Sequence, residues 1–251
     1  MPVVVVTEPV HPDALALLRD AGWQVVGPPA DPQPCDALLV RTRRLTAAEV
    51  GMTRMIAKHG VGVDNIPLDA ARAAGVAVLN TPGANAGAVA EQTVLLMLAL
   101  ARGLDAQRAA ALAGARSPAV RGVEGLRLTV VGYGDIGRRV AALGAALGMA
   151  VTVVPRSLAG AVTTQGYRVA TLAGALPGTD VLTLHCPLTD QTRHMIDAGA
   201  LAALPRGAMV VNTARGGIVD EAALAHALRA GHLGGAALDV TEVEPLPEDS
   251  P

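Results

Sequence analysis

Three glycines near the middle of the chain have a spacing that could hold a phosphate-containing ligand. They lie in Gly132-Tyr-Gly134-Asp135-Ile136-Gly137, which follows a β-branched run and opens an amphipathic segment. In such a turn Gly132 permits a tight bend, Gly134 lets the backbone approach a pyrophosphate, and Gly137 allows helix and strand to pack closely. Backbone N–H groups at the start of the following helix, at Asp135 and Ile136, would face the phosphates. A structural turn is the alternative, but the position between strand and helix predicts dinucleotide binding.

The end of the next predicted strand bears on which dinucleotide is bound. An Asp or Glu at this point accepts hydrogen bonds from a free ribose 2′-hydroxyl. Here Val151–Val154 is followed by Pro155, Arg156 and Ser157, with no acid. The Arg156 guanidinium could pair with a 2′-phosphate and Ser157 could donate to it, which favours NADP(H) over NAD(H). The alternative is an ordinary surface arginine, with NAD held by other contacts.

Composition excludes several classes of protein. The chain has 251 residues, 51% of them apolar, and 20 basic against 22 acidic side chains, which is typical of a globular protein without a nucleic-acid-binding surface. Its two cysteines, Cys35 and Cys186, form no CxxC pair, so we expect neither a metal site nor a disulfide scaffold. The apolar run Val94–Ala101 is too short to cross a membrane, and no signal peptide is evident. We therefore expect a soluble, cytoplasmic protein without a membrane partner.

Strand-like and helix-like segments alternate along both halves of the chain, which predicts parallel sheets covered by helices. The first half is expected to contain strands at Val3–Val6, Gln24–Val26, Ala37–Val40, Met55–Ala57 and Val76–Leu79, helices at Pro12–Ala21 and Leu68–Ala74, and a short helix capped by Thr46. The second is expected to contain strands at Leu128–Val131, Val151–Val154, Val181–His185, Met209–Asn212 and Ala236–Val240, with helices at Ala86–Arg102, Ile136–Leu147 and Glu221–Arg229. The predicted class is α/β with two doubly wound domains, residues 1–82 and 83–251.

Several further motifs carry a family resemblance. They are Lys58-His-Gly60-Val61-Gly62-Val-Asp-Asn, Asn80-Thr-Pro-Gly-Ala-Asn85, His185-Cys-Pro187-Leu-Thr189, Asn212-Thr213-Ala214-Arg215-Gly-Gly and Leu238-Asp239-Val-Thr-Glu-Val-Glu244-Pro. In this order the chain resembles D-isomer-specific 2-hydroxyacid dehydrogenases, nearest the branch of 3-phosphoglycerate dehydrogenase and hydroxypyruvate or glyoxylate reductase. The resemblance implies a flavodoxin-like substrate domain, a Rossmann dinucleotide-binding domain and a homodimer in which the Ala86–Arg102 region crosses to the partner.

The resemblance also implies catalytic and substrate-binding roles. Arg215 matches the arginine that holds the carboxylate of a 2-keto acid and polarises its carbonyl, and Glu244 matches the glutamate that pairs with a catalytic histidine. The backbone N–H groups of Val61 and Gly62 match a carboxylate-binding loop. Two more positions match substrate-side residues, namely the cleft-lining Asn85 and the basic Arg41. For Arg41, a structural salt bridge is an equal alternative.

A second set of residues matches the lining of the cofactor site. It comprises His185, Pro187, Thr189, Thr213, Ala214 and Asp239. Cys186, within the same motif as His185, is expected to be a packing residue rather than a nucleophile. The implied activity is hydride transfer between NAD(P) and C2 of a small D-2-hydroxy or 2-keto acid, without nucleic acid as a partner.

The sequence departs from the family pattern after Glu244. The family's acid/base histidine would follow beyond Pro251, and no histidine lies between Glu244 and Pro251. We therefore expect this sequence to belong to a longer protein. The alternative function is a non-catalytic dinucleotide-binding sensor, similar to corepressors that resemble this family. The presence of both Arg215 and Glu244 favours the enzyme, because a binding module has no need of that pair.

Overall fold

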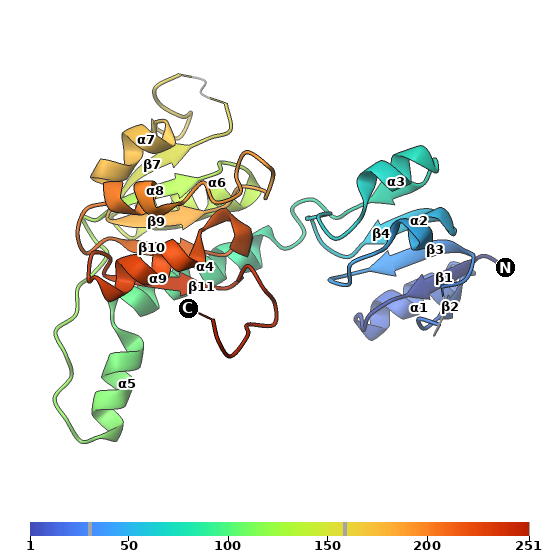
Figure 1. The fold of residues 1–251 in the computed structure, drawn as a ribbon, viewed down its shortest axis with the longest axis horizontal. Coiled ribbons are helices and arrows are strands. Elements are labelled where there is room, and N and C mark those ends of the chain that lie inside the picture. The colour runs from blue at the N-terminus through green and yellow to red at the C-terminus, as the bar shows by residue number, and fades with distance from the viewer. Residues whose placement is uncertain (30–31, 158–159, 251) are drawn as a thin grey trace. The chain divides into compact units, whose positions relative to one another are not determined.

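The computed structural model describes residues 1–29, 32–157 and 160–250 (Figure 1). The chain divides into two compact units, Met1–Asn85 and Ala86–Pro251. Each unit is built around its own parallel sheet, which confirms the predicted α/β class. The boundary expected from the sequence, between residues 82 and 83, lies three residues before the division between the units.

The first unit has a five-stranded sheet in the order β2-β1-β3-β4-β5, the flavodoxin-like arrangement. Its strands are β1 (Val3–Val6), β2 (Gln24–Val26), β3 (Cys35–Val40), β4 (Thr53–Lys58) and β5 (Ala77–Leu79), and its helices are α1 (Pro12–Asp20), α2 (Ala47–Gly51) and α3 (Leu68–Ala73). Val40, Val50 and Ile56 are fully buried in its core. The expected cap on α2 is confirmed, because Thr46 and Glu49 form a reciprocal capping box.

The second unit has a six-stranded sheet in the order β11-β10-β9-β6-β7-β8, which is the Rossmann order. Its strands are β6 (Arg127–Val131), β7 (Ala150–Val154), β8 (Arg168–Val169), β9 (Val181–Leu184), β10 (Met209–Asn212) and β11 (Gly235–Leu238). Its helices are α4 (Ala86–Ala101), α5 (Leu104–Leu112), α6 (Asp135–Ala146), α7 (Leu172–Ala175), α8 (Ala198–Ala203) and α9 (Glu221–Arg229), with 3₁₀ turns η1 (Leu176–Gly178) and η2 (Gly216–Ile218). Because all strand pairs are parallel, their carboxyl ends share one edge.

The second unit differs from the sequence expectations at the end of β11, and it contains one helix, α5, that the sequence patterns did not predict. Strand β11 ends at Leu238 rather than Val240, so Asp239 lies just beyond the strand. Helix α5 follows α4 after Gly103, whose φ of +55° breaks the helix, and it projects away from the sheet (Figure 1).

Aromatic side chains are few and are divided between the two units. The single tryptophan, Trp23, lies in the first unit. Both tyrosines, Tyr133 and Tyr167, lie in the second, where their rings meet edge to face with centroids 6.4 Å apart. The chain has no phenylalanine, so aliphatic residues fill both cores, and methionines join them in the core of the second unit.

Within the described parts of the chain, no single helix is both long and apolar enough to cross a bilayer. Helices α4 and α5 satisfy that criterion only as a pair, with a bend of 56° between them.

Candidate functional site

The glycine turn after β6 combines two packing glycines with one open glycine. A Cβ on Gly132, whose φ is +92°, would lie 2.6 Å from the His185 carbonyl carbon. A Cβ on Gly137 would lie 2.0 Å from the Gly132 carbonyl oxygen. A Cβ on Gly134 would meet no atom within 4 Å. Gly132 and Gly137 therefore hold the turn together, whereas Gly134 leaves open space beside it.

That open space lies at the amino end of α6, where a dinucleotide pyrophosphate would fit. Gly134 is the N-cap residue and supplies no side-chain cap, so the first amides of α6 are available to a ligand. Asp135 and Ile136 form the first turn as expected, although the exposed Asp135 also places a carboxylate there. Arg156 and Ser157 lie just after β7 and are exposed.

His185 brings a buried, neutral imidazole to the end of β9. Its amide donates to the Val131 carbonyl at 2.7 Å, and its Nε2 lies 2.9 Å from the Thr183 hydroxyl oxygen. Its Nδ1 is buried and has no hydrogen-bond partner among the described residues. Burial lowers the pKa of His185 to about 4. An unpaired buried nitrogen beside the glycine turn fits a site completed by a ligand.

The rest of the His185 motif forms a self-supporting turn. The Thr192 hydroxyl donates to the Pro187 carbonyl at 2.7 Å and accepts from the Thr189 amide at 2.8 Å. Cys186 contacts the Met195 sulfur at 3.9 Å, and burial raises the pKa of its thiol. These contacts support the expected packing role of Cys186, since a buried thiol with a raised pKa is a poor nucleophile.

Arg215 lies on a turn that Asn212 holds from both sides. The fully buried Asn212 side chain donates to the Arg215 carbonyl at 2.9 Å and accepts from the Ala214 amide at 3.0 Å. The partly buried Arg215 side chain donates to the Ala214 carbonyl at 2.7 Å. Asn212 was not among the predicted site residues, although its position at the end of a buried strand was a usable signal.

The turn of Arg215 packs directly against the segment that carries Glu244. A Cβ on Gly216 would lie 2.0 Å from the Thr241 carbonyl carbon, so the two backbones are in contact. The exposed Glu244 accepts from the Thr241 amide at 3.2 Å. Glu242, in the same segment, lies 3.0 Å from the His194 ring nitrogen. The structure thus brings the segments of Arg215 and Glu244 together.

Two residues of α4 contact the remaining predicted cofactor residues. The Thr93 hydroxyl lies 2.9 Å from the Thr213 hydroxyl, and both side chains are buried. The Gln92 amide donates to the Asp239 carboxylate at 3.1 Å. Gln92 and Thr93 were not predicted as site residues because they lie inside an otherwise apolar helix.

The predicted substrate residues of the first unit lie on turns at the carboxyl ends of its strands. The Asn80 side chain donates to the Val61 carbonyl at 2.8 Å, and the Thr81 amide donates to the Gly60 carbonyl at 3.1 Å. These bonds use carbonyl groups and leave the amides of Val61 and Gly62 to other acceptors. Asn85 is exposed and is the last residue of the unit.

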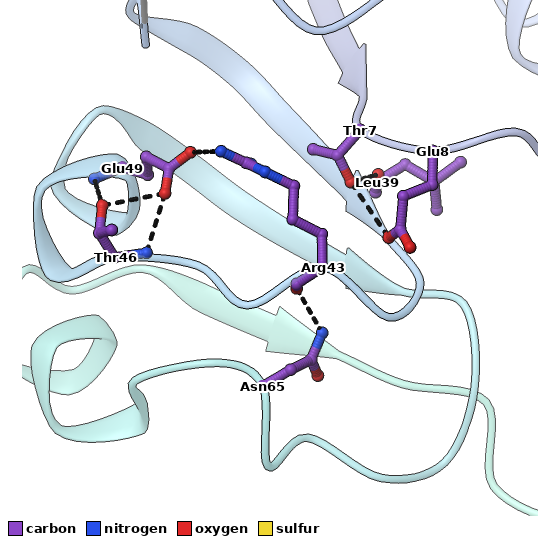
Figure 2. Close-up of polar contacts among 7 residues, drawn as sticks. All are labelled: Thr7, Glu8, Leu39, Arg43, Thr46, Glu49 and Asn65. Carbon is purple, nitrogen blue, oxygen red and sulfur yellow. Dashed lines mark hydrogen bonds and ion pairs between the residues drawn. The ribbon is translucent and has the colours of Figure 1, made fainter. Parts of the chain in front are cut away.

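Arg41 lies on a turn that is held through its backbone. Its amide donates to the Glu8 carboxylate at 2.6 Å, and its carbonyl accepts from the Lys58 ammonium group. The Asn65 side chain donates to the Arg43 carbonyl at 2.7 Å (Figure 2). The alternative of a structural salt bridge is not supported, because within the described ranges the exposed Arg41 side chain makes no ion pair.

Acidic side chains hold this turn at two points. Burial alone would raise the pKa of Glu8, but hydrogen bonds from the Thr42 hydroxyl and from the amides of residues 41–43 lower it to about 2. The nearly buried Glu49 pairs with the Arg43 guanidinium and caps α2 (Figure 2). Among the described residues, no group of three or more His, Cys, Asp or Glu side chains is placed to hold a metal ion.

Comparison with known proteins agrees with this geometry. The family described as "D-isomer specific 2-hydroxyacid dehydrogenase, NAD binding domain" matches residues 94–251. The chain is 43% identical to (S)-sulfolactate dehydrogenase of Chromohalobacter salexigens over 85% of this chain and 72% of that protein. It is 37% identical to glyoxylate reductase of Aeropyrum pernix over 100% of this chain and 82% of that protein.

A solved structure and further relatives complete the comparison. D-lactate dehydrogenase from Aquifex aeolicus, complexed with NAD and lactic acid, superposes with a TM-score of 0.87 and 27% identity, covering 99% of this chain and 82% of that one. The chain spans half the length of the D-3-phosphoglycerate dehydrogenases to which it is also similar. The chain belongs to the D-isomer specific 2-hydroxyacid dehydrogenase family.

Proposed function

We propose that this protein transfers a hydride between a nicotinamide dinucleotide and C2 of a small D-2-hydroxy or 2-keto acid. The observation that carries the proposal is the turn of Arg215, which Asn212 clamps and which Gly216 packs against the Glu244 segment. The glycine turn with open space at Gly134 belongs to the same unit. The activities of the relatives, among them sulfolactate dehydrogenase, glyoxylate reductase and hydroxypyruvate reductase, support a small 2-hydroxy or 2-keto acid of the glyoxylate, hydroxypyruvate or phosphoglycerate class.

The proposed roles follow from the chemistry of the side chains. A bound nicotinamide supplies or accepts the hydride. The Arg215 guanidinium offers several N–H donors in one plane, which suits a carboxylate and stabilises the negative charge that develops on the carbonyl oxygen. The Glu244 carboxylate would orient the imidazole that exchanges the proton and would raise its pKa. In the first unit, the amides of Val61 and Gly62, with Arg41 and Asn85, would receive the substrate.

We propose NADP(H) as the preferred cofactor, and a cytoplasmic homodimer as the working form. The cofactor preference rests on Arg156 and Ser157, which are exposed at the end of β7 where an acid would otherwise bind a ribose hydroxyl. The homodimer rests on α4 and the projecting α5, whose Leu104 and Leu112 are 55% and 79% exposed. A cytoplasmic location agrees with two cysteines that are both free thiols.

Oxidation of NADH and NADPH by the purified protein, with glyoxylate and hydroxypyruvate as substrates, tests the proposal. We expect turnover, and we expect Arg215→Ala to lower kcat/KM by about 100-fold because it removes the donor to the developing oxyanion. Arg206→Ala, which removes an exposed arginine after α8, is the matched control. A loss below about tenfold for Arg215→Ala would contradict its role. Tight nucleotide binding without turnover of any 2-keto acid would favour a non-catalytic sensor.

A further inference from the structure

The hydroxyl groups of Thr93 and Thr213 form a buried chain whose hydrogen positions are fixed by chemistry. Thr93 Oγ lies 2.7 Å from the Val89 carbonyl oxygen and 2.9 Å from Thr213 Oγ. A hydroxyl has one hydrogen to donate, and a carbonyl oxygen can only accept. The Thr93 hydrogen must therefore go to Val89, so the Thr213 hydrogen must go to Thr93. The Thr213 hydroxyl is left with acceptor capacity alone.

Asp239 presents a second acceptor beside Thr213. The Asp239 amide donates to the Asn212 carbonyl at 2.9 Å, which places residue 239 next to the end of β10. The Gln92 side chain donates to Asp239 Oδ1 at 3.1 Å and restricts the rotation of the carboxylate. Asp239 is exposed, so its other oxygen can accept from a ligand. The neighbouring α4 residues Gln92 and Thr93 thus orient acceptors at the ends of β10 and β11.

The position of these acceptors in the sheet indicates which half of the dinucleotide would contact them. The Rossmann sheet consists of two mononucleotide-binding halves that meet between β6 and β9. Arg156 and Ser157 follow β7, in the half proposed to take the adenosine, whereas β10 and β11 belong to the other half. The nicotinamide carboxamide, with two N–H donors on one nitrogen, is the group that matches paired acceptors in that half.

We propose that Thr93 and Gln92 are positioning residues for the cofactor, which orient Thr213 and Asp239 as acceptors for the N–H groups of the nicotinamide carboxamide. This inference rests on the proposed function, since it requires a nicotinamide dinucleotide. In this proposal, residues of the packing helix α4 determine that the groups at the ends of β10 and β11 accept hydrogen bonds from the cofactor. Neither residue needs to touch the ligand.

Isothermal titration with NAD⁺ and with its 3-acetylpyridine analogue tests the proposal. The analogue replaces the amide nitrogen by a methyl group and has no N–H donor. We expect Thr93→Val to weaken NAD⁺ binding about fivefold but the analogue by less than about twofold, because only NAD⁺ uses the acceptors. Thr93→Ser, which keeps the hydroxyl, should restore the wild-type ratio of the two dissociation constants.

The chain offers a matched control in a second buried threonine pair. Thr179 Oγ lies 2.8 Å from the Ala175 carbonyl oxygen and 2.7 Å from Thr129 Oγ, which is the same arrangement at the opposite edge of the sheet. Thr179→Val should therefore leave the ratio of the two dissociation constants unchanged. Gln92→Leu, at a partly exposed position, should reduce the preference for NAD⁺ over the analogue. This variant tests the proposal if Thr93→Val does not fold.

The outcomes separate this inference from the proposed function. Equal weakening of both nucleotides by Thr93→Val, or by Gln92→Leu if the first variant does not fold, would overturn the positioning role and leave the dehydrogenase assignment intact. Failure of the wild-type protein to bind NAD⁺, NADP⁺ or the analogue would overturn the proposed function and this inference with it.

Discussion

At the scale of single residues, buried polar atoms mark the ends of the central strands of the second unit. His185 directly follows β9, and Asn212 ends the neighbouring strand β10. Asn212 uses both ends of its amide on one turn, whereas His185 keeps one buried ring nitrogen unpaired among the described residues. Water-excluded groups of this kind cost stability unless a ligand or a partner satisfies them. Their presence at the carboxyl edge of the sheet is consistent with a binding role.

The depressed pKa of His185 predicts how stability depends on pH. Its pKa is about 4 in the folded protein against 6.5 in the unfolded chain, so the unfolded state binds more protons between these values. Stability from this group is therefore complete above about pH 6.5 and falls as pH decreases toward 4, by at most about 1.4 kcal/mol per pH unit. Urea unfolding between pH 4.5 and 7 should show a smaller slope for His185→Gln than for wild type.

His226→Gln is the control for this pH dependence, because His226 is exposed on α9. It should reproduce the wild-type slope. A slope in His185→Gln as steep as that of wild type would show that another group causes the loss of stability.

At the scale of elements, the six-residue glycine turn contains glycines needed for packing and one glycine beside the proposed ligand space. Gly137→Ala would place a methyl group against the Gly132 carbonyl, so we expect it to lower the free energy of unfolding by about 1–3 kcal/mol. Gly134→Ala places its methyl group in open space at a φ of −86°, which alanine adopts readily, and should keep near-wild-type stability. Because that space is where a pyrophosphate would lie, Gly134→Ala should weaken NAD⁺ binding at least about tenfold.

Thermal unfolding and nucleotide titration of the two glycine variants check this contrast. A Gly134→Ala protein that is stable and still binds NAD⁺ normally would exclude the turn as the pyrophosphate site. A Gly137→Ala protein with unchanged stability would show that the turn can shift to accept a side chain.

Elements with strong local signals were predictable from the sequence, and those that depend on distant contacts were not. The β-branched strands, the Thr46 cap and the glycine turn are local patterns, and the structure contains each of them. Helix α5 was missed because its exposed, alanine-rich sequence lacks an apolar stripe of its own. Thr93 was missed because its partner Thr213 is 120 residues away in sequence. Family motifs indicated which residues gather at the strand ends, but only the fold shows what holds them.

At the scale of the whole molecule, the chain consists of two units with separate cores, and the proposed cofactor belongs to one of them. A ligand that binds only the native state stabilises its own unit by RT ln(1 + [L]/Kd), about 2.7 kcal/mol at 100 times Kd. We therefore expect saturating NAD⁺ to slow hydrogen exchange in core strands of residues 86–250 by roughly 100-fold where exchange requires unfolding of that unit. Strands of residues 1–85 should change little.

Hydrogen exchange monitored by mass spectrometry, with and without NAD⁺, measures this difference. Gly134→Ala provides the control, since its strands should gain little protection. Equal protection of both units by NAD⁺ would show that the two unfold together or that the nucleotide binds both.

Because the tyrosines and the tryptophan lie in different units, fluorescence energy transfer between them depends on the distance between the two units. Tyrosine emission overlaps tryptophan absorption, so any energy transfer from Tyr133 or Tyr167 in the second unit to Trp23 in the first would vary with that distance. With no other tryptophan or tyrosine in the chain, every transfer event within a protomer that reaches tryptophan crosses from one unit to the other. Adding a 2-keto acid to the nucleotide-bound protein and recording the transfer efficiency would follow any movement of one unit toward the other without attaching a dye.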